Sequence, residues 1–454
     1  MLDKEINLYK RHKVIYTDPV PGKFDKIRTL SMSVVALSFF LIPWLSYHGR
    51  QAVMFDILTI RFYFFKYVFW PQDFILFAIF VMMCILGLFT ITVFVGRVWC
   101  GFLCPQSVWV RFAAFLTRMV EGKMNKRIKN DLKDFTFNHF MKKVVKHCLI
   151  FLFSLATGFT LVSYFISVTF LITSIFSFNI LQWSFFWIVF ITILTHLNVH
   201  WFKEQFCFII CPYARLQSVM FDKNTLIIAY NSDRGEKRGS RKKNAVLTNS
   251  DLGDCIDCNA CVNCCPTGID IRHGLQIECI TCAACIDACN SVMKKMGYKK
   301  NLIGYIKESD LNVNYNPGVN IRFYAYFIAS VILLLIFSYL LINRNLIQLH
   351  INRSQLKLYN VTVDNFIENS YILKITNKTN DNMQYNISIC EDNFNYIGLS
   401  KIALNKEDTI LLDVMISIHK TFTTSCFHSI TFKIENINNT KDFLTKTVKF
   451  ILPN

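Results

Sequence analysis

Residues 254–289 read DCIDCNACVNCCPTGIDIRHGLQIECITCAACIDAC. Two cysteine runs in this stretch share the spacing C-x2-C-x2-C-x3-C, which is typical of loops that hold cubane iron–sulfur clusters. In such pairs of runs, the first three cysteines bind one cluster and the fourth binds the other cluster. The pattern therefore predicts two [4Fe–4S] clusters, one on Cys255, Cys258, Cys261 and Cys289, and one on Cys279, Cys282, Cys285 and Cys265.

The same cysteines could instead form zinc sites or a set of disulfides. Zinc ribbons usually contain two separated C-x2-C pairs rather than runs of three with a trailing fourth cysteine. Cys264 lies directly before Cys265 and could compete with it as a ligand. A proline follows Cys265, as in the usual cluster-binding run, so we take Cys265 as the ligand and Cys264 as an additional thiol.

The composition predicts a membrane protein. The chain has 454 residues, of which 53% are hydrophobic, and yet its net charge is +18. A membrane protein combines these properties when its basic loops stay on one side of the bilayer. The segment 51–70 is apolar but contains charged residues, so we expect an interfacial element there. Five apolar runs reach the roughly 20 residues that span a bilayer, namely 30–48, 73–96, 147–174, 181–200 and 323–343.

The distribution of lysine and arginine predicts the orientation of these spans. The segment 97–146 has eleven basic and three acidic residues, and the loop 175–180 has no charge. Basic loops stay in the cytoplasm, where thiols also remain reduced. Basic runs such as Lys237-Arg238 beside spans favour lipid headgroups over nucleic acid as a partner. We therefore expect an inner-membrane protein with a cytoplasmic N-terminus (1–29). A four-helix transmembrane region (30–200) follows, and its loop 97–146 is cytoplasmic. Next come a cytoplasmic region (201–322), with the ferredoxin domain at about 245–300, and a fifth transmembrane helix (323–343).

Two further cysteine pairs follow the second and fourth apolar runs. Each pair reads C-x3-C-P, with Cys100 and Cys104 in the first pair and Cys207 and Cys211 in the second. Four soft thiolates from two related hairpins could converge on Cu(I), on an iron–sulfur centre or as a redox disulfide. Cysteines that simply pack at the interface are the alternative. The repeat of the whole unit favours a common redox or metal site.

The last hundred residues differ from the rest of the chain. From about residue 351, short runs of alternating apolar and polar residues are separated by clusters of Asn, Asp and Thr. This pattern predicts an immunoglobulin-like β-sandwich over 351–454, which the predicted orientation puts in the periplasm. Its only cysteines, Cys390 and Cys426, could pair there, but sequence does not decide it. His196 and His200, four residues apart, are expected to be polar ends of a span rather than metal ligands.

The order of these motifs resembles the CcoG/FixG/RdxA family of accessory proteins for cbb3-type cytochrome oxidase. The sequence CGFLCPQSVW at 100–109, the run C-x3-C-P-Y-A-R-L-Q at 207–217, both ferredoxin runs and the β-rich tail carry the resemblance. It implies a membrane iron–sulfur protein that reduces Cu(II) to Cu(I) during assembly of the oxidase copper centre. The oxidase or its copper chaperones are the implied partners. The chain departs from the family pattern at Cys264 and at the two histidines.

The expected chemistry follows from ligand preference. Cu(I) prefers thiolates and Cu(II) prefers nitrogen and oxygen, so a four-thiolate site would favour the reduced ion. Cys100, Cys104, Cys207 and Cys211 are therefore the candidate catalytic residues. The sequence has no G-x-G-x-x-G fingerprint, so we expect the electron donor to be another protein or a membrane quinol. A quinol-oxidising membrane subunit, and a non-enzymatic scaffold or redox sensor, remain alternatives, and the chain could form a homodimer.

Overall fold

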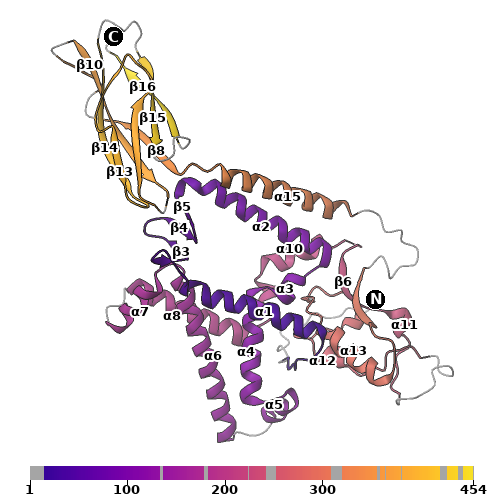
Figure 1. Cartoon of the computed structure of the whole chain (residues 1–454). Coiled ribbons are helices and arrows are strands. Elements are labelled where there is room, and N and C mark those ends of the chain that lie inside the picture. Colours follow the sequence, from indigo (N-terminus) through magenta and orange to yellow (C-terminus); the bar gives the residue numbers. More distant parts are fainter. Residues whose placement is uncertain are drawn as a thin grey trace, which may run out of the picture. The chain divides into compact units, whose positions relative to one another are not determined.

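Figure 1 shows the computed structural model of the chain. The chain divides into two compact units, one of Met1–Phe55 with Ala78–Leu335 and one of Asp56–Phe77 with Ile336–Asn454. The side chains of Gln182, Phe208 and Ser218 are not described. The structure describes residues 15–132, 136–177, 182–222, 224–241, 252–307, 320–354, 358–362, 365–379, 381–419, 427–437 and 443–452.

Among these described residues, five helices are long and apolar enough to cross a membrane. The number agrees with the five apolar runs of the sequence. In the first unit, α2 and α15 run side by side, because Phe94 contacts Phe323 and Thr90 lies 3.4 Å from Ser330 (Figure 1). The five helices are α1 (Lys23–Leu41), α2 (Phe74–Val95), α6 (Phe137–Ser163), α8 (Gln182–Leu197) and α15 (Ile321–Ile342).

The expected third span, 147–174, is not one helix. Helix α6 begins ten residues earlier and ends at Ser163, and a separate helix α7 (Val168–Phe176) follows. The break is stabilised by polar partners that a hydropathy pattern cannot reveal. The Gln51 side chain donates to the Ser163 carbonyl at 2.8 Å and accepts from the Val168 N–H at 3.4 Å. The backbone groups that the break exposes are therefore hydrogen-bonded.

Short helices connect the spans of the first unit. Helix α4 carries Trp109, whose Nε1 donates to Thr157 of α6 at 3.1 Å. Met32 of α1, Val108 and Ile150 are buried in the same core, so α1, α4 and α6 are held together. These connecting helices are α3 (Val98–Phe102), α4 (Pro105–Glu121), α5 (Met124–Asp131), η3 (Asn198–Phe202), α9 (Gln205–Ile209) and α10 (Pro212–Met220).

The cluster-binding region is framed by two strands, β6 (Leu226–Tyr230) and β7 (Ile303–Lys307), which pair antiparallel. Ile228, Ile286 and Leu302 are buried in its core. Both strands lie outside the expected range of 245–300, because cysteine spacing marks only the loops. Between them lie α11 (Ser232–Gly235), α12 (Ala260–Asn263), the short η5 turn (Ile271–His273) and α13 (Ala284–Met296).

Helix α13 also caps the N-terminus of α1. The Asp287 carboxylate accepts the backbone N–H groups of Phe24 at 3.3 Å and Asp25 at 2.8 Å. A carboxylate at this position satisfies helix N–H groups and complements the positive end of the helix dipole. A Cβ on Gly22 would lie 2.1 Å from Asp287 Cγ. The residue before α1 must therefore be glycine for this cap to form.

The segment 46–69 contains short strands rather than a further span. It holds β1 (Ser46–Tyr47), β2 (Arg50–Gln51), β3 (Val53–Asp56), β4 (Arg61–Phe64) and β5 (Tyr67–Phe69). Strands β4 and β5 pair antiparallel. The Arg61 guanidinium lies 4.1 Å from the Trp70 ring centroid, so an arginine in this apolar stretch is accommodated by a cation–π contact.

The second unit contains two antiparallel sheets that enclose one core. One sheet has the order β12-β14-β10-β8, with β9 on β10, and the other has the order β13-β11-β15-β16. Ile367, Leu373, Phe432 and Phe450 of the core are fully buried. The strands are β8 (Ile347–Arg353), β9 (Asn360–Val361), β10 (Phe366–Asn377), β11 (Met383–Ile389), β12 (Asn395–Ile397), β13 (Lys401–Leu404), β14 (Thr409–His419), β15 (Phe427–Asn436) and β16 (Phe443–Ile451).

A buried ion cluster lies in the second unit where helices and sheets meet. Asp73 contacts Arg344 Nη2 at 2.5 Å and Lys378 Nζ at 3.1 Å, and each of the three side chains is less than 10% exposed. Such a cluster is costly to desolvate and depends on every partner being present.

Cys390 is an exposed free thiol, and Cys426 lies outside the described residues, so their pairing stays a prediction.

Candidate functional site

The two ferredoxin runs fold into loops with the same backbone conformation. Asp257 and Asn259, which flank Cys258, have φ values of 53° and 54°. Thr281 and Ala283, which flank Cys282, have φ values of 54° and 60°. Left-handed backbone at residues other than glycine is strained and is found mainly where function requires it. The repeated strain indicates that both loops are shaped to surround a bound group.

Each loop lines a small cavity with the thiols that the sequence groups together. One cavity is lined by Cys255, Cys258, Cys261 and Cys289. The other is lined by Cys265, Cys279, Cys282 and Cys285, and also touches Cys261. The fourth cysteine of each run thus faces the cavity of the other run, as interleaved [4Fe–4S] ligation requires. The donor set and its distribution fit two such clusters.

Cys264 has a different position from the predicted ligands. Its Sγ donates to the Cys261 carbonyl at 3.4 Å, and it is buried. It lines neither of the two small cavities but a larger cavity beside α4. This placement favours Cys265 as the cluster ligand.

Within the described part of the chain, no three His, Cys, Asp or Glu side chains come close enough to hold a single metal ion. A cubane distributes its four thiolates over four iron atoms, so its ligands need not converge on one point. Burial raises the pKa of the Cys279 and Cys289 thiols to about 12. Binding of iron would have to displace these protons, because the thiolate is the ligand.

The two C-x3-C-P motifs have the same local structure. Cys104 and Cys211 each precede a helix that begins with proline, α4 and α10 respectively. The Cys104 N–H donates to the Trp99 carbonyl at 2.9 Å, and the Cys211 N–H donates to the Phe206 carbonyl at 3.1 Å. Proline suits the first helical position because its missing N–H has no partner there. The sequence repeat is therefore also a structural repeat.

The four thiols of these motifs lie in one region. Burial raises the pKa of Cys100 and of Cys207 to about 12, and in both cases the charges of Cys104 and Cys211 contribute in the same direction. The thiols therefore influence one another electrostatically, without converging on a single point. That they form one functional site stays a prediction.

Polar residues that the sequence did not single out join the two motifs. The Cys100 thiol donates to Gln217 Oε1 at 3.5 Å, and the fully buried Gln217 donates to Thr92 at 3.3 Å. Arg97, only 2% exposed, donates to the carbonyls of Ala214 and Ile277. Of these polar residues, only Gln217 lies in one of the motifs quoted from the sequence, so only Gln217 could have been suspected of a role there. Arg97 thus connects α3, α10 and the start of the second ferredoxin run.

Helix α3 lies directly against the second ferredoxin loop. A Cβ on Gly101 would be 2.8 Å from the Ile280 carbonyl oxygen and 2.9 Å from Cys282 Cα. Such distances are shorter than any normal contact, so only glycine permits this approach. Gly101 lies between the two thiols of the first motif, which brings that motif next to a predicted cluster ligand.

A histidine that the sequence did not single out lies beside the expected pair. The ring centroid of His147 is 4.3 Å from that of His200 and 5.7 Å from that of His196. These three histidines do not form a group that could hold a metal ion. The expectation that His196 and His200 are polar ends rather than ligands stays a prediction.

Family models match three parts of the chain. A 4Fe-4S dicluster domain matches residues 202–308, and a 4Fe-4S binding domain matches residues 77–122. A domain described as the IG-like fold at the C-terminal of FixG, putative oxidoreductase, matches residues 337–453. With five apolar helices, these matches define a membrane iron–sulfur protein of the electron-transfer, oxidoreductase-like class.

Relatives identify the family. The chain is 34% identical to Protein RdxB of Cereibacter sphaeroides over 85% of this chain and 84% of that protein. It is 33% identical to Protein RdxA of the same organism over 84% and 83% of the two chains. It is 35% identical to Nitrogen fixation protein FixG of Rhizobium meliloti over 68% of this chain, which spans 60% of that relative. The chain belongs to the FixG/RdxA family.

A solved structure, the crystal structure of a FixG-related protein from Vibrio parahaemolyticus, is 20% identical over 24% of this chain and 96% of that chain. Its TM-score of 0.21 is too low to establish a shared fold.

Proposed function

We propose that the chain is a cupric reductase of the inner membrane, which reduces Cu(II) to Cu(I) for the copper centre of cbb3-type cytochrome oxidase. The observation that carries this proposal is the close approach of Gly101 to the Ile280 and Cys282 backbone. It brings the first C-x3-C-P motif against a loop whose cysteines suit a [4Fe–4S] cluster. A site for soft metal ions and a site for single electrons are thus adjacent.

The residues have distinct roles in this proposal. Cys255, Cys258, Cys261 and Cys289 would hold one cluster, and Cys279, Cys282, Cys285 and Cys265 the other. When bound, such clusters supply single electrons.

Cys100, Cys104, Cys207 and Cys211 would receive the copper ion. Thiolates stabilise Cu(I) over Cu(II) and so favour its reduction. Gln217 positions the Cys100 thiol.

The placement of the parts is also a proposal, supported by the lysine and arginine pattern. The ferredoxin region would lie in the cytoplasm and the immunoglobulin-like domain in the periplasm. The latter would then be able to reach the oxidase or a copper chaperone. A homodimer is compatible with this arrangement.

The proposal is tested with anaerobic, pre-reduced full-length protein from which excess reductant has been removed. Added Cu(II) should oxidise the clusters and give Cu(I) in proportion. Cys104→Ser and Cys211→Ser should each lower the rate by about a hundredfold or more, and the double variant no further, because residues that act as a unit are non-additive. The matched control is Cys148→Ser, an exposed cysteine of α6 outside both motifs, which should react like the wild type.

Iron content must be measured beside the rate. Wild type, Cys104→Ser and Cys211→Ser should each contain about eight iron atoms, from two four-iron clusters. Wild-type rates in both serine variants would remove the four thiols from the mechanism.

A third cluster on the four membrane thiols is the second candidate. The 4Fe-4S binding domain that matches residues 77–122 favours it, because this range contains Cys100 and Cys104. About twelve iron atoms in the wild type, with about four lost in Cys104→Ser, would assign the thiols to iron instead of copper.

A further inference from the structure

A large cavity lies beside α4, and Cys207 is the one lining residue to which the proposed copper chemistry gives a role. Its volume is about 720 Å³, within the range of small-molecule sites. It extends along α1 from Asp25 to Phe40 and along α4 from Gln106 to Arg118. Cys207 and Cys264 also line it. The cavity therefore touches a thiol of the second C-x3-C-P motif and the additional thiol of the first ferredoxin run.

One part of the cavity wall is aromatic. Phe40 stacks with Trp109 at 6.1 Å between ring centroids, with an angle of 14° between the rings. The ring centroids of Phe112 and Phe153 are 4.4 Å apart. The side chains of Phe112 and Phe115 are 41% and 53% exposed. Flat aromatic walls suit a flat ring. Because α1 is also an apolar, membrane-length helix, exposed side chains on these walls suit contact with an acyl or isoprenoid chain.

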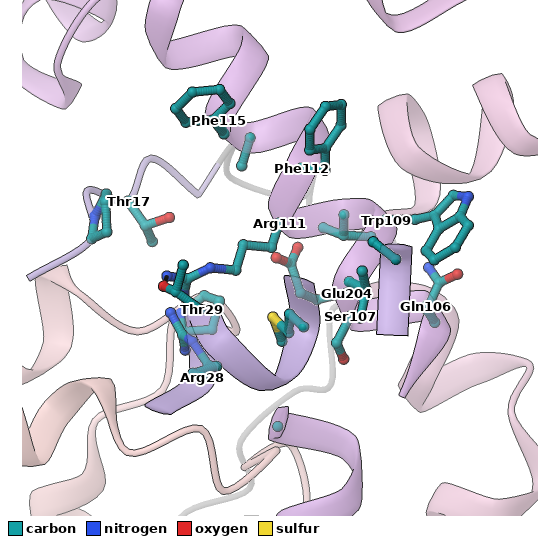
Figure 2. A pocket seen from close by; sticks show the side chains of 18 of the residues that line it. Thr17, Arg28, Thr29, Gln106, Ser107, Trp109, Arg111, Phe112, Phe115 and Glu204 are labelled. Carbon is teal, nitrogen blue, oxygen red and sulfur yellow. Dashed lines mark hydrogen bonds between the residues drawn. The ribbon is translucent and has the colours of Figure 1, made fainter. Parts of the chain in front are cut away.

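Another part of the wall is polar, but its charges are largely balanced. Arg111 Nη2 donates to Asp25 at 2.7 Å and to Thr29 at 2.9 Å, and Arg28 lies 3.8 Å from the same carboxylate. Figure 2 shows Arg28 and Thr29 of α1 and Arg111 of α4 along this part of the wall. The charged lining residues are Arg28, Arg111, Arg118 and Lys203 against Asp18, Asp25 and Glu204. A phosphate would meet carboxylates and arginines that are already paired, so a neutral ligand with hydroxyl or carbonyl groups fits better.

We infer that this cavity binds the ring of a membrane quinone or hydroquinone, with its tail along the exposed apolar side chains of α1 and α4. The inference rests on the proposed function for its role, which would be to supply electrons. One hydroquinone and two Cu(II) ions give one quinone, two Cu(I) ions and two protons. Both protons are released to water.

Binding is tested without copper, on anaerobic full-length protein in phosphatidylcholine nanodiscs. The probe is decylubiquinone, and the measured quantity is its equilibrium dissociation constant. Ala36→Trp and Ala114→Trp place a large ring at positions that line the cavity, so each should weaken binding by about tenfold or more. Ala325→Trp is the matched control, because Ala325 is an exposed alanine of α15 that does not line the cavity. Iron content of each variant reports whether it has folded.

The outcomes separate this inference from the proposed function. Weaker binding in both filled variants, with wild-type binding in Ala325→Trp, supports the site. Equal binding in the wild type and all three tryptophan variants overturns it. Loss of binding when anionic phosphatidylglycerol replaces part of the lipid also overturns it, because the cavity would then bind lipid. If the protein does not bind the quinone but, once pre-reduced, still reduces Cu(II), only the quinone site is overturned. Binding without any copper reduction overturns only the copper chemistry.

Discussion

At the scale of single residues, Gly101 decides how closely the thiol motif approaches the ferredoxin loop. Its neighbours there are backbone atoms of Ile280 and Cys282. Backbone cannot move aside as the end of a flexible side chain can, so an added methyl group must push α3 away from the loop. The separation between the first thiol motif and the ferredoxin loop is therefore set by the absence of one carbon atom.

Gly101→Ala should lower the stability of the protein by about 1–3 kcal/mol, the usual cost of overpacking, and slow copper reduction. Gly87→Ala in α2 is the matched control, because a Cβ added at Gly87 would meet no atom within 4 Å. Alanine is a better helix former than glycine, so this control should be unchanged or slightly stabilised. Thermal unfolding and the rate of Cu(I) formation are the measurements. Equal unfolding temperatures for the two variants would contradict the steric argument.

Residue patterns grouped the cysteines that line each small cavity, but they did not indicate the contacts that support the loops. The spacing of the ferredoxin runs is a local property, so the grouping around each cavity could be predicted from the sequence. Arg97 and Asp287 act on segments more than 100 residues away. Asp287 lies at an unspecified position of the second ferredoxin run, and Arg97 precedes the first thiol motif. Tertiary partners of this kind leave no periodic signal.

At the scale of helices and strands, the Asp73 cluster connects the start of α2 with the end of α15 and with the β-sheets of the second unit. Two buried cations share one carboxylate. Removal of the carboxylate leaves both charges uncompensated away from water.

Asp73→Asn should therefore destabilise the second unit by about 3–5 kcal/mol, as breaking a buried ion pair does. The measurement is limited proteolysis of the β-domain in the full-length protein. Lys433→Gln serves as the comparison, because its ion pair with Glu435 is on the surface, where such pairs contribute little. Equal proteolysis of the two variants would show that the cluster does not hold this unit together.

Hydropathy predicted the number of spanning helices but not all of their ends. Helix α1 begins at Lys23, before the apolar run, because Asp287 caps it. Helix α6 also begins in a basic stretch, and it ends inside an apolar one. Helix ends depend on hydrogen-bonding partners, whereas hydropathy reports only the length of apolar surface.

At the scale of the whole molecule, the five spans predict that the two ends of the chain lie on opposite sides of the membrane. A reporter fused after Asn454 should be active only outside the cytoplasm, and one inserted after Ser240 only inside it. Alkaline phosphatase and a fluorescent protein, respectively, report the two compartments. Activity of both reporters on the same side would disprove an odd number of spans.

The large cavity beside α4 could not have been predicted from the sequence. It is formed by segments near residues 28, 111, 204 and 264, and nothing in the sequence shows that these segments meet. Its aromatic residues belong to apolar stretches that are typical of any span. A site built from separate segments becomes visible only when the fold is known.

The cap on α1 has a consequence for the order in which the protein is made. The first helix leaves the ribosome long before Asp287, its hydrogen-bonding partner 262 residues further along the chain. During synthesis, the N–H groups at the N-terminus of this helix therefore stay hydrated while three more segments enter the membrane. The helix is completed only when the ferredoxin segment has been translated and has folded back onto it. A product truncated before Asp287 is therefore left with an unfinished first helix.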